Sequence, residues 1–305
     1  MRKYDIHPDF KKLRFIKMPR SLFINKVGNF FLRLGYRLQK INSKATCTRY
    51  KLPVSDGEEI NFDMITPKEK KIRPCLIYFP GGGFLMAATQ FHKKIIADIA
   101  VDQDIAVAMV HYRLAPKYPF PTALNDAIAC LEYLDDQALK YDIDNNRFAI
   151  GGDSAGGSLA AGVCLYARDR LNVKLRCAML VYPATDDKET KSRKTYVDTP
   201  MFHSRMLPII KKAYFANGHF DLKKYAFPMM HDKHEGLPPT YIETAEFDPL
   251  HDEGVNYAAK LKDNNVEVVL NETKGTVHGY DILSKSEIVK EAYARRKSFI
   301  GEHLK

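Results

Sequence analysis

The chain has 305 residues, of which 45% are hydrophobic and 28% charged. This balance is typical of an ordinary soluble globular protein and excludes disordered, fibrous and membrane-embedded chains. The formal net charge of +10 is confined to residues 1–45, which hold twelve Lys and Arg against Asp5 and Asp9, whereas the remainder has 35 basic and 35 acidic residues. A neutral body argues against a nucleic-acid partner, because phosphate contacts need a basic groove on that body too.

The cysteines and the N-terminus indicate the cellular compartment in which the protein is expected. Five widely spaced cysteines, with no C-x-x-C pair or His-rich cluster that could bind zinc, are predicted to be reduced core residues. They are Cys47, Cys75, Cys130, Cys164 and Cys177. The N-terminus lacks the apolar region of a signal peptide, and no run of about 18 apolar residues suits a spanning helix. We therefore expect a cytoplasmic protein without stable membrane insertion and without a metal.

The first predicted element is a helix at Leu22–Tyr36. Phe, Leu and Val recur there at helical spacing, while Lys26, Arg33 and Arg37 lie elsewhere around the helix. The apolar stripe is consistent with packing on the rest of the protein or with an interfacial membrane helix. The basic segment 1–45 is therefore read either as a solvated face or as a contact for an anionic substrate or membrane surface.

From about residue 46 the chain alternates short apolar runs with longer helical patterns, which predicts a mostly parallel sheet covered by helices on both faces. Thr46–Val54 and Glu58–Ile65 are predicted to form an initial pair of strands. Six more strands are expected at Pro74–Phe79, Ile105–Val110, Arg147–Ile150, Cys177–Tyr182, Pro239–Ala245 and Val266–Asn271. Helices are expected near 89–102, 121–139, 155–170, 251–263 and 285–303. The fold class is α/β, with eight strands.

Two regions do not follow this alternation. They are the basic segment 1–45 and residues 186–235, which begin with a charged stretch at 186–189. Both are lid candidates. We expect a helical cap segment over 1–45 and one catalytic domain over 46–305, with a cap insertion at about 186–235.

The sequence around Ser154 contains the main chemical signal. An apolar strand leads into Gly152-Asp153-Ser154-Ala155-Gly156, and a helix rich in small residues follows. In a G-x-S-x-G elbow the serine lies in a strained turn that exposes its hydroxyl above the sheet, and the glycines prevent collisions between strand and helix. The helix N-terminus also favours developing negative charge. Ser154 is the candidate nucleophile.

A serine hydroxyl needs a base, and the base needs a partner that orients it. Two late loops supply candidates. Asp248 follows one predicted strand, and His278 follows the last one, so the order Ser, Asp, His is the one expected for hydrolases of this kind. His251 is the other late histidine. Asp252 is expected on the next helix as a surface or capping group.

The stabilisation of an oxyanion requires donors aimed at the reacting carbonyl. Pro80–Phe84 follows a predicted strand and contains three consecutive glycines, whose N–H groups can point into a site without interference from side chains. The N–H of Ala155 adds a further donor.

Together these residues resemble the hormone-sensitive-lipase-like family of esterases, which includes acetyl esterase-type enzymes, over about residues 70–300. The matching motifs are Pro80–Phe84, Tyr112–Pro116 with Pro119–Pro121, Gly152–Gly157, Asp248–Leu250 with Asp252–Gly254, and His278–Gly279. The resemblance implies an α/β-hydrolase fold in which Ser154, Asp248 and His278 form the catalytic triad.

The resemblance also implies that Gly82, Gly83 and Ala155 are the oxyanion donors, and that residues 1–45 help to build a cap. Family members typically hydrolyse short-acyl carboxylic esters without a cofactor, and pairing through an edge strand suggests a homodimer. Three positions depart from the family pattern: Pro80, His111 and Lys117 replace His, Asp and Glu. Proline has no N–H and no polar side chain, so a hydrogen bond that steadies the loop from this position is lost.

The prediction is a serine carboxylesterase acting on a small-molecule ester. An amidase, deacetylase or peptidase with the same triad remains an alternative, because the lid and pocket determine the leaving group. Further alternatives are a ligand-binding protein on the hydrolase scaffold and an interaction protein whose basic segment docks on anionic membranes. Four aromatic side chains are candidates to narrow the acyl pocket: Phe23, Phe30, Phe31 and Phe202.

Overall fold

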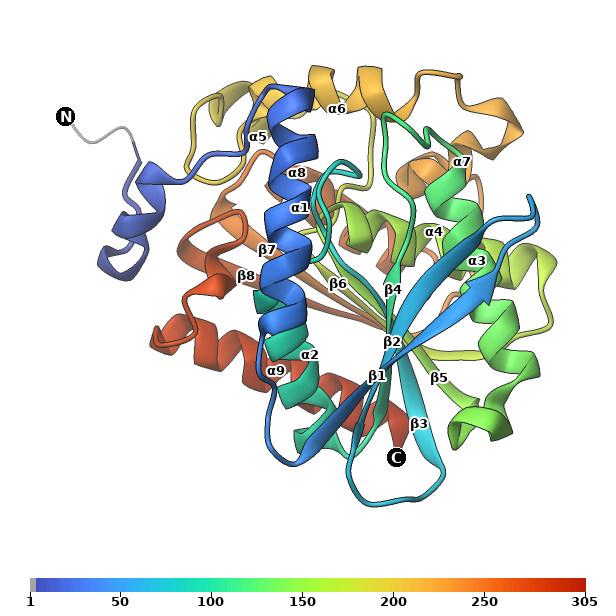
Figure 1. The fold of residues 1–305 in the computed structure, drawn as a ribbon. Helices are drawn as coiled ribbons and strands as arrows, with labels where there is room; N and C mark the ends of the chain where they lie inside the picture. The colour runs from blue at the N-terminus through green and yellow to red at the C-terminus, as the bar shows by residue number, and fades with distance from the viewer. Residues whose placement is uncertain (1–3) are drawn as a thin grey trace.

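An eight-stranded sheet in the order β1-β2-β4-β3-β5-β6-β7-β8 runs through the computed structural model, which describes residues 4–305 (Figure 1). In chain order the strands are β1 (Ala45–Pro53), β2 (Glu59–Pro67), β3 (Arg73–Phe79), β4 (Ala106–His111), β5 (Ile143–Asp153), β6 (Leu175–Val181), β7 (Thr240–Phe247) and β8 (Val268–Val277). The pairs β1–β2 and β2–β4 are antiparallel, and the others are parallel. The predicted eight strands and mostly parallel sheet are confirmed.

The last strand differs from its prediction. The apolar pattern suggested an end at Asn271, but β8 continues to Val277 after an irregularity in its pairing with β7. Gly275 lies in this stretch with φ of 69°, a conformation that favours glycine. In the sequence, a glycine at this position looks like the start of a turn. Because the strand continues, its end delivers residue 278 to the carboxyl edge of the sheet.

Long helices cover both faces of the sheet, as predicted. One face carries α2 (Gln90–Gln103) and α9 (Glu287–Leu304), and the other carries α3 (Thr122–Asp136), α4 (Ala155–Arg170) and α8 (His251–Asp263). The remaining helices are α1 (Leu22–Leu38), α5 (Lys191–Thr195), α6 (Leu207–Tyr214) and α7 (Lys223–Ala226). Short 3-10 helices lie at Pro8–Phe15, Ala138–Tyr141, Ser204–Met206, Phe220–Leu222, Pro228–Met230 and Tyr280–Ile282.

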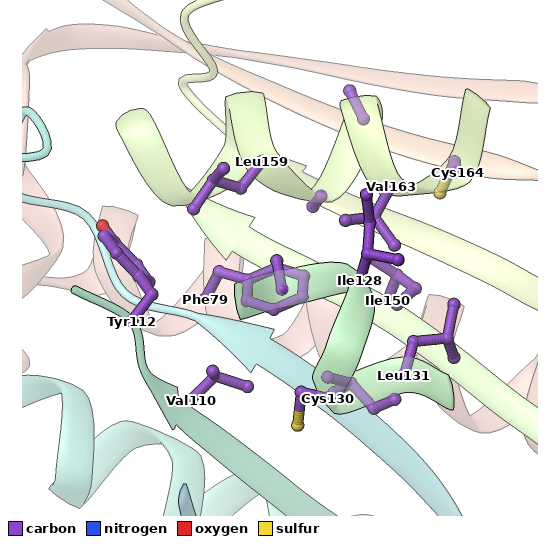
Figure 2. Close-up of a cluster of buried hydrophobic side chains, with 14 of the residues drawn as sticks. Phe79, Val110, Tyr112, Ile128, Cys130, Leu131, Ile150, Leu159, Val163 and Cys164 are labelled. Atoms are coloured by element: carbon purple, nitrogen blue, oxygen red, sulfur yellow. The ribbon is translucent and has the colours of Figure 1, made fainter. Parts of the chain in front are cut away.

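The core forms a layer on each side of the sheet. Figure 2 shows part of the layer between the sheet and helices α3 and α4, where Phe79 and Ile150 face Ile128, Leu159 and Val163. Every residue of the central strand β3 is buried, as expected of a parallel strand covered on both sides. Four of the five unpaired cysteines are buried and the fifth is half-buried, which agrees with their predicted core role.

The N-terminal segment and residues 186–235 meet above the carboxyl edge of the sheet. The backbone N–H of Met18 donates to the Met201 carbonyl at 2.9 Å, and the N–H of Met201 donates to the Ile16 carbonyl at 2.7 Å. These bonds connect the two segments directly. Across residues 4–305, every helix falls short of the length and apolar character needed to cross a membrane.

The helix predicted at Leu22–Tyr36 is present as α1, but its apolar stripe does not pack on the rest of the protein. The side of α1 that faces the body holds Asn25 and Tyr36, which are buried, and Asn29, which is half-buried. Most of the large apolar side chains are exposed to solvent instead, and Leu32 is half-buried. Of the two alternatives for this stripe, packing on the body is therefore wrong.

Candidate active site

The turn between β5 and α4 holds Ser154 in a strained conformation. Its φ of 53° and ψ of −120° are rare for a residue with a side chain. The turn is tight because strand and helix approach closely: a Cβ on Gly152 would collide with the Gly156 carbonyl, and one on Gly156 with the Phe79 carbonyl. Only glycine fits at these two positions. The backbone N–H of Ser154 donates to the Val181 carbonyl at 2.8 Å, which fixes the turn on the neighbouring strand.

The fold brings together the three predicted residues, although they lie up to 124 positions apart. His278 Nε2 lies 2.9 Å from Ser154 Oγ, and His278 Nδ1 lies 2.6 Å from Asp248 Oδ2. Asp248 is completely buried, and its Oδ1 accepts the Leu250 N–H at 2.9 Å. The three side chains are thus joined in one hydrogen-bonded chain, which is the arrangement that a nucleophile, its base and an orienting carboxylate require.

The other late histidine takes no part in this chain. His251 contacts Asp252 at 3.0 Å and Glu272 at 3.2 Å. Asp252 also accepts the Ser192 N–H at 2.8 Å, so it attaches α5 to the start of α8. Of the two late histidines, His278 is thus the one within hydrogen-bonding distance of Ser154, and Asp252 lies on the next helix, α8, as expected.

His278 lies between two aromatic rings and next to the carboxylate of Asp248. The ring centroids of Tyr182 and Phe202 lie 4.6 and 4.9 Å from that of the imidazole. Burial alone would lower the pKa of His278, but the charge of Asp248 and its hydrogen bond outweigh burial and raise this pKa above the ordinary value. Asp248 therefore favours the imidazolium form of His278.

The glycine loop after β3 lies beside the serine. Gly82 and Gly83 have φ of 131° and 60°, and they line the same cavity as Ser154. Neither of their N–H groups donates to another residue of the described chain, 4–305. Ala155 is the first residue of α4, so its N–H has no acceptor within the helix. The residues of these three predicted donors line the same cavity as Ser154.

Neighbouring side chains hold the loop although Pro80 offers no hydrogen bond from its own side chain. The Tyr112 hydroxyl donates to the Pro80 carbonyl at 2.6 Å. The Gly81 N–H donates to Asp153 Oδ1 at 3.0 Å, and the Tyr78 hydroxyl donates to the same oxygen at 2.8 Å. The expected loss of loop anchoring at residue 80 is thus offset by contacts from other elements.

Asp153 and His92 are functional candidates that the sequence analysis missed. The Thr89 N–H donates to His92 Nδ1 at 2.9 Å, so the proton of the neutral imidazole is on Nε2, which faces Asp153 Oδ2 at 3.2 Å. Burial would raise the pKa of Asp153, but His92 and the hydrogen bonds lower it, so the carboxylate is ionised at neutral pH. The elbow motif could have drawn attention to Asp153. No sequence signal identifies His92.

The other departures from the family pattern do not disturb the loop after β4. Arg113 forms a bidentate pair with Asp126, and its backbone N–H donates to the same carboxylate at 2.8 Å. His111 contacts Asp63 instead, at 3.0 Å. Lys117 lies on the surface. Within residues 4–305, neither His111 nor Lys117 forms a hydrogen bond with Arg113.

A buried ion-pair network lies behind the histidine. Arg296 pairs with Glu243 and, at 2.8 Å, with Asp281. The Tyr182 hydroxyl donates to Asp281 at 2.7 Å, and the ring of Tyr182 contacts His278. All of these side chains are buried. The network thus fixes one wall of the site.

The serine opens into a cavity of about 370 Å³. Its walls are mostly apolar and come in part from residues 16–19 and from Phe202, Leu207 and Ile210. The prediction that aromatic side chains narrow this pocket is correct for Phe202 but wrong for Phe23, Phe30 and Phe31, because α1 turns them toward solvent. Within residues 4–305, no group of three or more His, Cys, Asp or Glu is arranged to hold a metal.

Comparison with known proteins identifies the family. A family model described as "alpha/beta hydrolase fold" matches residues 76–282. The chain therefore belongs to the alpha/beta hydrolase fold family, as the motifs predicted.

Several relatives are esterases by name. The chain is 35% identical to "Esterase LipI" of Mycobacterium tuberculosis, over 68% of this chain and 65% of that one. It is 32% identical to "Ethyl acetate hydrolase" of Pseudomonas putida, over 72% and 69%. The match thus spans slightly less than two thirds of the length of LipI. Among solved structures, "Bacterial Heroin Esterase" superposes with a TM-score of 0.89 at 31% identity, over 99% of this chain and 98% of that one.

Proposed function

We propose that this protein is a serine carboxylesterase that hydrolyses short-acyl carboxylic esters. The observation that carries the proposal is the hydrogen-bonded chain from Ser154 through His278 to Asp248, which opens into a cavity beside Gly82 and Gly83. The esterase names of the relatives support the reaction class. A cavity of about 370 Å³ with mostly apolar walls favours a small, weakly polar acyl group.

The proposed reaction has two steps. His278 Nε2 takes the Ser154 proton as Oγ attacks the ester carbonyl, and the N–H groups of Gly82, Gly83 and Ala155 stabilise the oxyanion. The imidazolium then returns the proton to the alcohol as the ester bond breaks, which leaves an acyl-serine. In the second step His278 takes a proton from water, the resulting attack releases the acid, and the proton returns to the serine oxygen.

Two flanking segments are proposed as the cap. Residues 1–45 and 186–235 both contribute walls to the cavity, through residues 16–19 and 201–210, and backbone hydrogen bonds join them. The catalytic domain of this proposal is 46–305. A cap in this position would exclude water from the acyl-serine and select the acyl chain.

Replacement of the nucleophile tests the proposal. Ser154→Ala should abolish turnover of p-nitrophenyl acetate while the melting temperature stays close to that of the parent protein. Undiminished turnover by this variant would refute the assignment. A series of p-nitrophenyl esters of increasing acyl length should show a decline for chains longer than the cavity accepts.

Amide hydrolysis is the second candidate. The chain is 29% identical to "Arylacetamide deacetylase" of Bos taurus over 70% of its length, and the same residues could attack an amide. Comparison of p-nitrophenyl acetate with p-nitroacetanilide distinguishes the two activities. The proposal predicts a much higher kcat/KM for the ester.

A further inference from the structure

Helix α1 is attached to the rest of the protein by hydrogen bonds from its side chains and by the buried ring of Tyr36. The Asn29 side chain donates to the Leu85 carbonyl at 2.8 Å and accepts the Ala87 N–H at 2.8 Å. The Tyr36 hydroxyl donates to the buried Asp63 at 2.7 Å. Hydrogen bonds therefore hold this helix in place, and its apolar side chains are free for another contact.

The opposite side of α1 is apolar and exposed. Phe23, Phe31 and Leu38 expose 74%, 63% and 73% of their surface, and Figure 1 shows no other element in front of the helix. Of the fifteen exposed large apolar residues in the described chain, ten fall between residues 15 and 38. Exposed apolar side chains that have no partner are normally scattered singly over a protein surface. A cluster of them in one segment therefore marks a contact surface. The apolar face comprises Phe23, Ile24, Val27, Phe30, Phe31, Leu34 and Leu38.

The charge beside this face specifies the kind of surface it contacts. At about 100° per residue, Lys26, Arg33 and Arg37 form one stripe along the edge of the apolar face. None of the three pairs with a carboxylate of residues 4–305. From residue 10 to residue 55 the chain contains twelve Lys and Arg and no acidic residue. The partner surface must therefore be anionic as well as apolar.

A second copy of the chain does not meet this requirement. In a two-fold contact the same patch lies on both sides, and because residues 10–55 contain no acidic residue, this segment of a second copy offers no acidic partner to the basic stripe. An anionic phospholipid surface offers both features. Its headgroups attract Lys and Arg, and the boundary with the acyl chains accepts Phe and Leu.

We propose that α1 docks on anionic phospholipid membranes, with the apolar face in the boundary between headgroups and acyl chains and the basic stripe on the headgroups. Residues 16–19, which precede the helix, line the cavity at Ser154. A docked α1 would therefore hold residues 16–19, and with them this wall of the cavity, next to the lipid surface. The docking itself does not depend on the proposed function, and Ser154→Ala protein should bind vesicles as the parent does.

Co-sedimentation of the full chain with phosphatidylcholine vesicles, with and without phosphatidylglycerol, tests the proposal. We expect binding only with phosphatidylglycerol, and weaker binding as salt rises. Phe23→Ser with Phe31→Ser should weaken binding at least about tenfold. Lys26→Gln with Arg33→Gln should weaken it about thirtyfold.

Matched controls are available on the rest of the surface. Leu139 is 80% exposed, and Leu139→Ser should leave binding unchanged. Lys174→Gln with Lys262→Gln removes two charges outside the N-terminal segment and should have a much smaller effect than the pair on α1. Unchanged turnover of dissolved p-nitrophenyl acetate and an unchanged circular dichroism spectrum show that the α1 variants are folded.

A tryptophan reporter supplies an independent measurement, because the chain contains no tryptophan. The emission of Phe23→Trp should shift to shorter wavelength with anionic vesicles and be quenched by brominated lipid, whereas that of Leu139→Trp should not change. No binding to anionic vesicles, or equal binding by the Phe23/Phe31 double variant, would overturn the proposal. So would a stable dimer that this double variant converts to monomer, because a second copy would then cover the face.

Discussion

Asp153 offers the sharpest test of how the glycine loop is held. Its Oδ1 accepts the Gly81 N–H and the Tyr78 hydroxyl, and its Oδ2 faces the protonated Nε2 of His92. Asp153→Asn keeps the first oxygen but places an NH2 group opposite the His92 N–H. One buried donor then loses its acceptor, at a cost of about 1–3 kcal/mol. Asp153→Ala leaves all three donors without an acceptor.

The two substitutions should differ in their effect on turnover. If about 1.4 kcal/mol of the cost in Asp153→Asn falls on the transition state, kcat falls about tenfold. In Asp153→Ala the Gly81 peptide is released and the loop donors move, so a loss of about a hundredfold or more is expected, comparable to the removal of one oxyanion donor. KM should change little, because the oxyanion exists only in the transition state.

Steady-state kinetics with p-nitrophenyl acetate, together with melting temperatures, measures both effects. The exposed Asp232 serves as a control, and Asp232→Asn should keep the parent kcat. A folded Asp153→Ala variant with the parent kcat would refute the view that this carboxylate positions the loop.

Three further predictions follow from the buried groups. Because only the neutral imidazole can accept a proton, kcat/KM should fall as pH drops through the pKa of His278, with a midpoint above the ordinary value of about 6.5; Asp248→Asn should remove most activity and lower that midpoint, as a pH profile would show. Gly156→Ala should prevent soluble expression, because its Cβ would collide with the Phe79 carbonyl; a soluble variant with the parent melting temperature would contradict this. Arg296→Ala leaves two buried carboxylates without their cation and should lower the free energy of unfolding by about 3–5 kcal/mol; urea titration would measure the loss, and an unchanged midpoint would contradict it.

The sequence was most informative about reactive side chains that directly follow a strand. Ser154 follows β5, Asp248 follows β7 and His278 follows β8. Because the carboxyl ends of parallel strands share one edge of a sheet, the predicted strand positions and mostly parallel sheet were enough to expect these three residues together. The predictions of eight strands and of helices on both faces rested on the same alternation of apolar patterns.

The sequence was least informative about contacts between elements. The pattern of α1 predicted an amphipathic helix but could not show which side meets the protein, because periodicity does not reveal the partner of a face. The assignment of Phe23, Phe30 and Phe31 to the pocket failed for this reason. The contact between His92 and Asp153 links α2 to the elbow, and no spacing in one sequence predicts such a pairing.

The central claim is that Ser154 is the nucleophile of a covalent mechanism. Peptide mapping by mass spectrometry after reaction with a fluorophosphonate probe tests it most directly. The account predicts one labelled peptide with the adduct on Ser154, and no labelling in His278→Ala. An adduct on another residue, or full reactivity of the Ser154→Ala protein, would contradict the account.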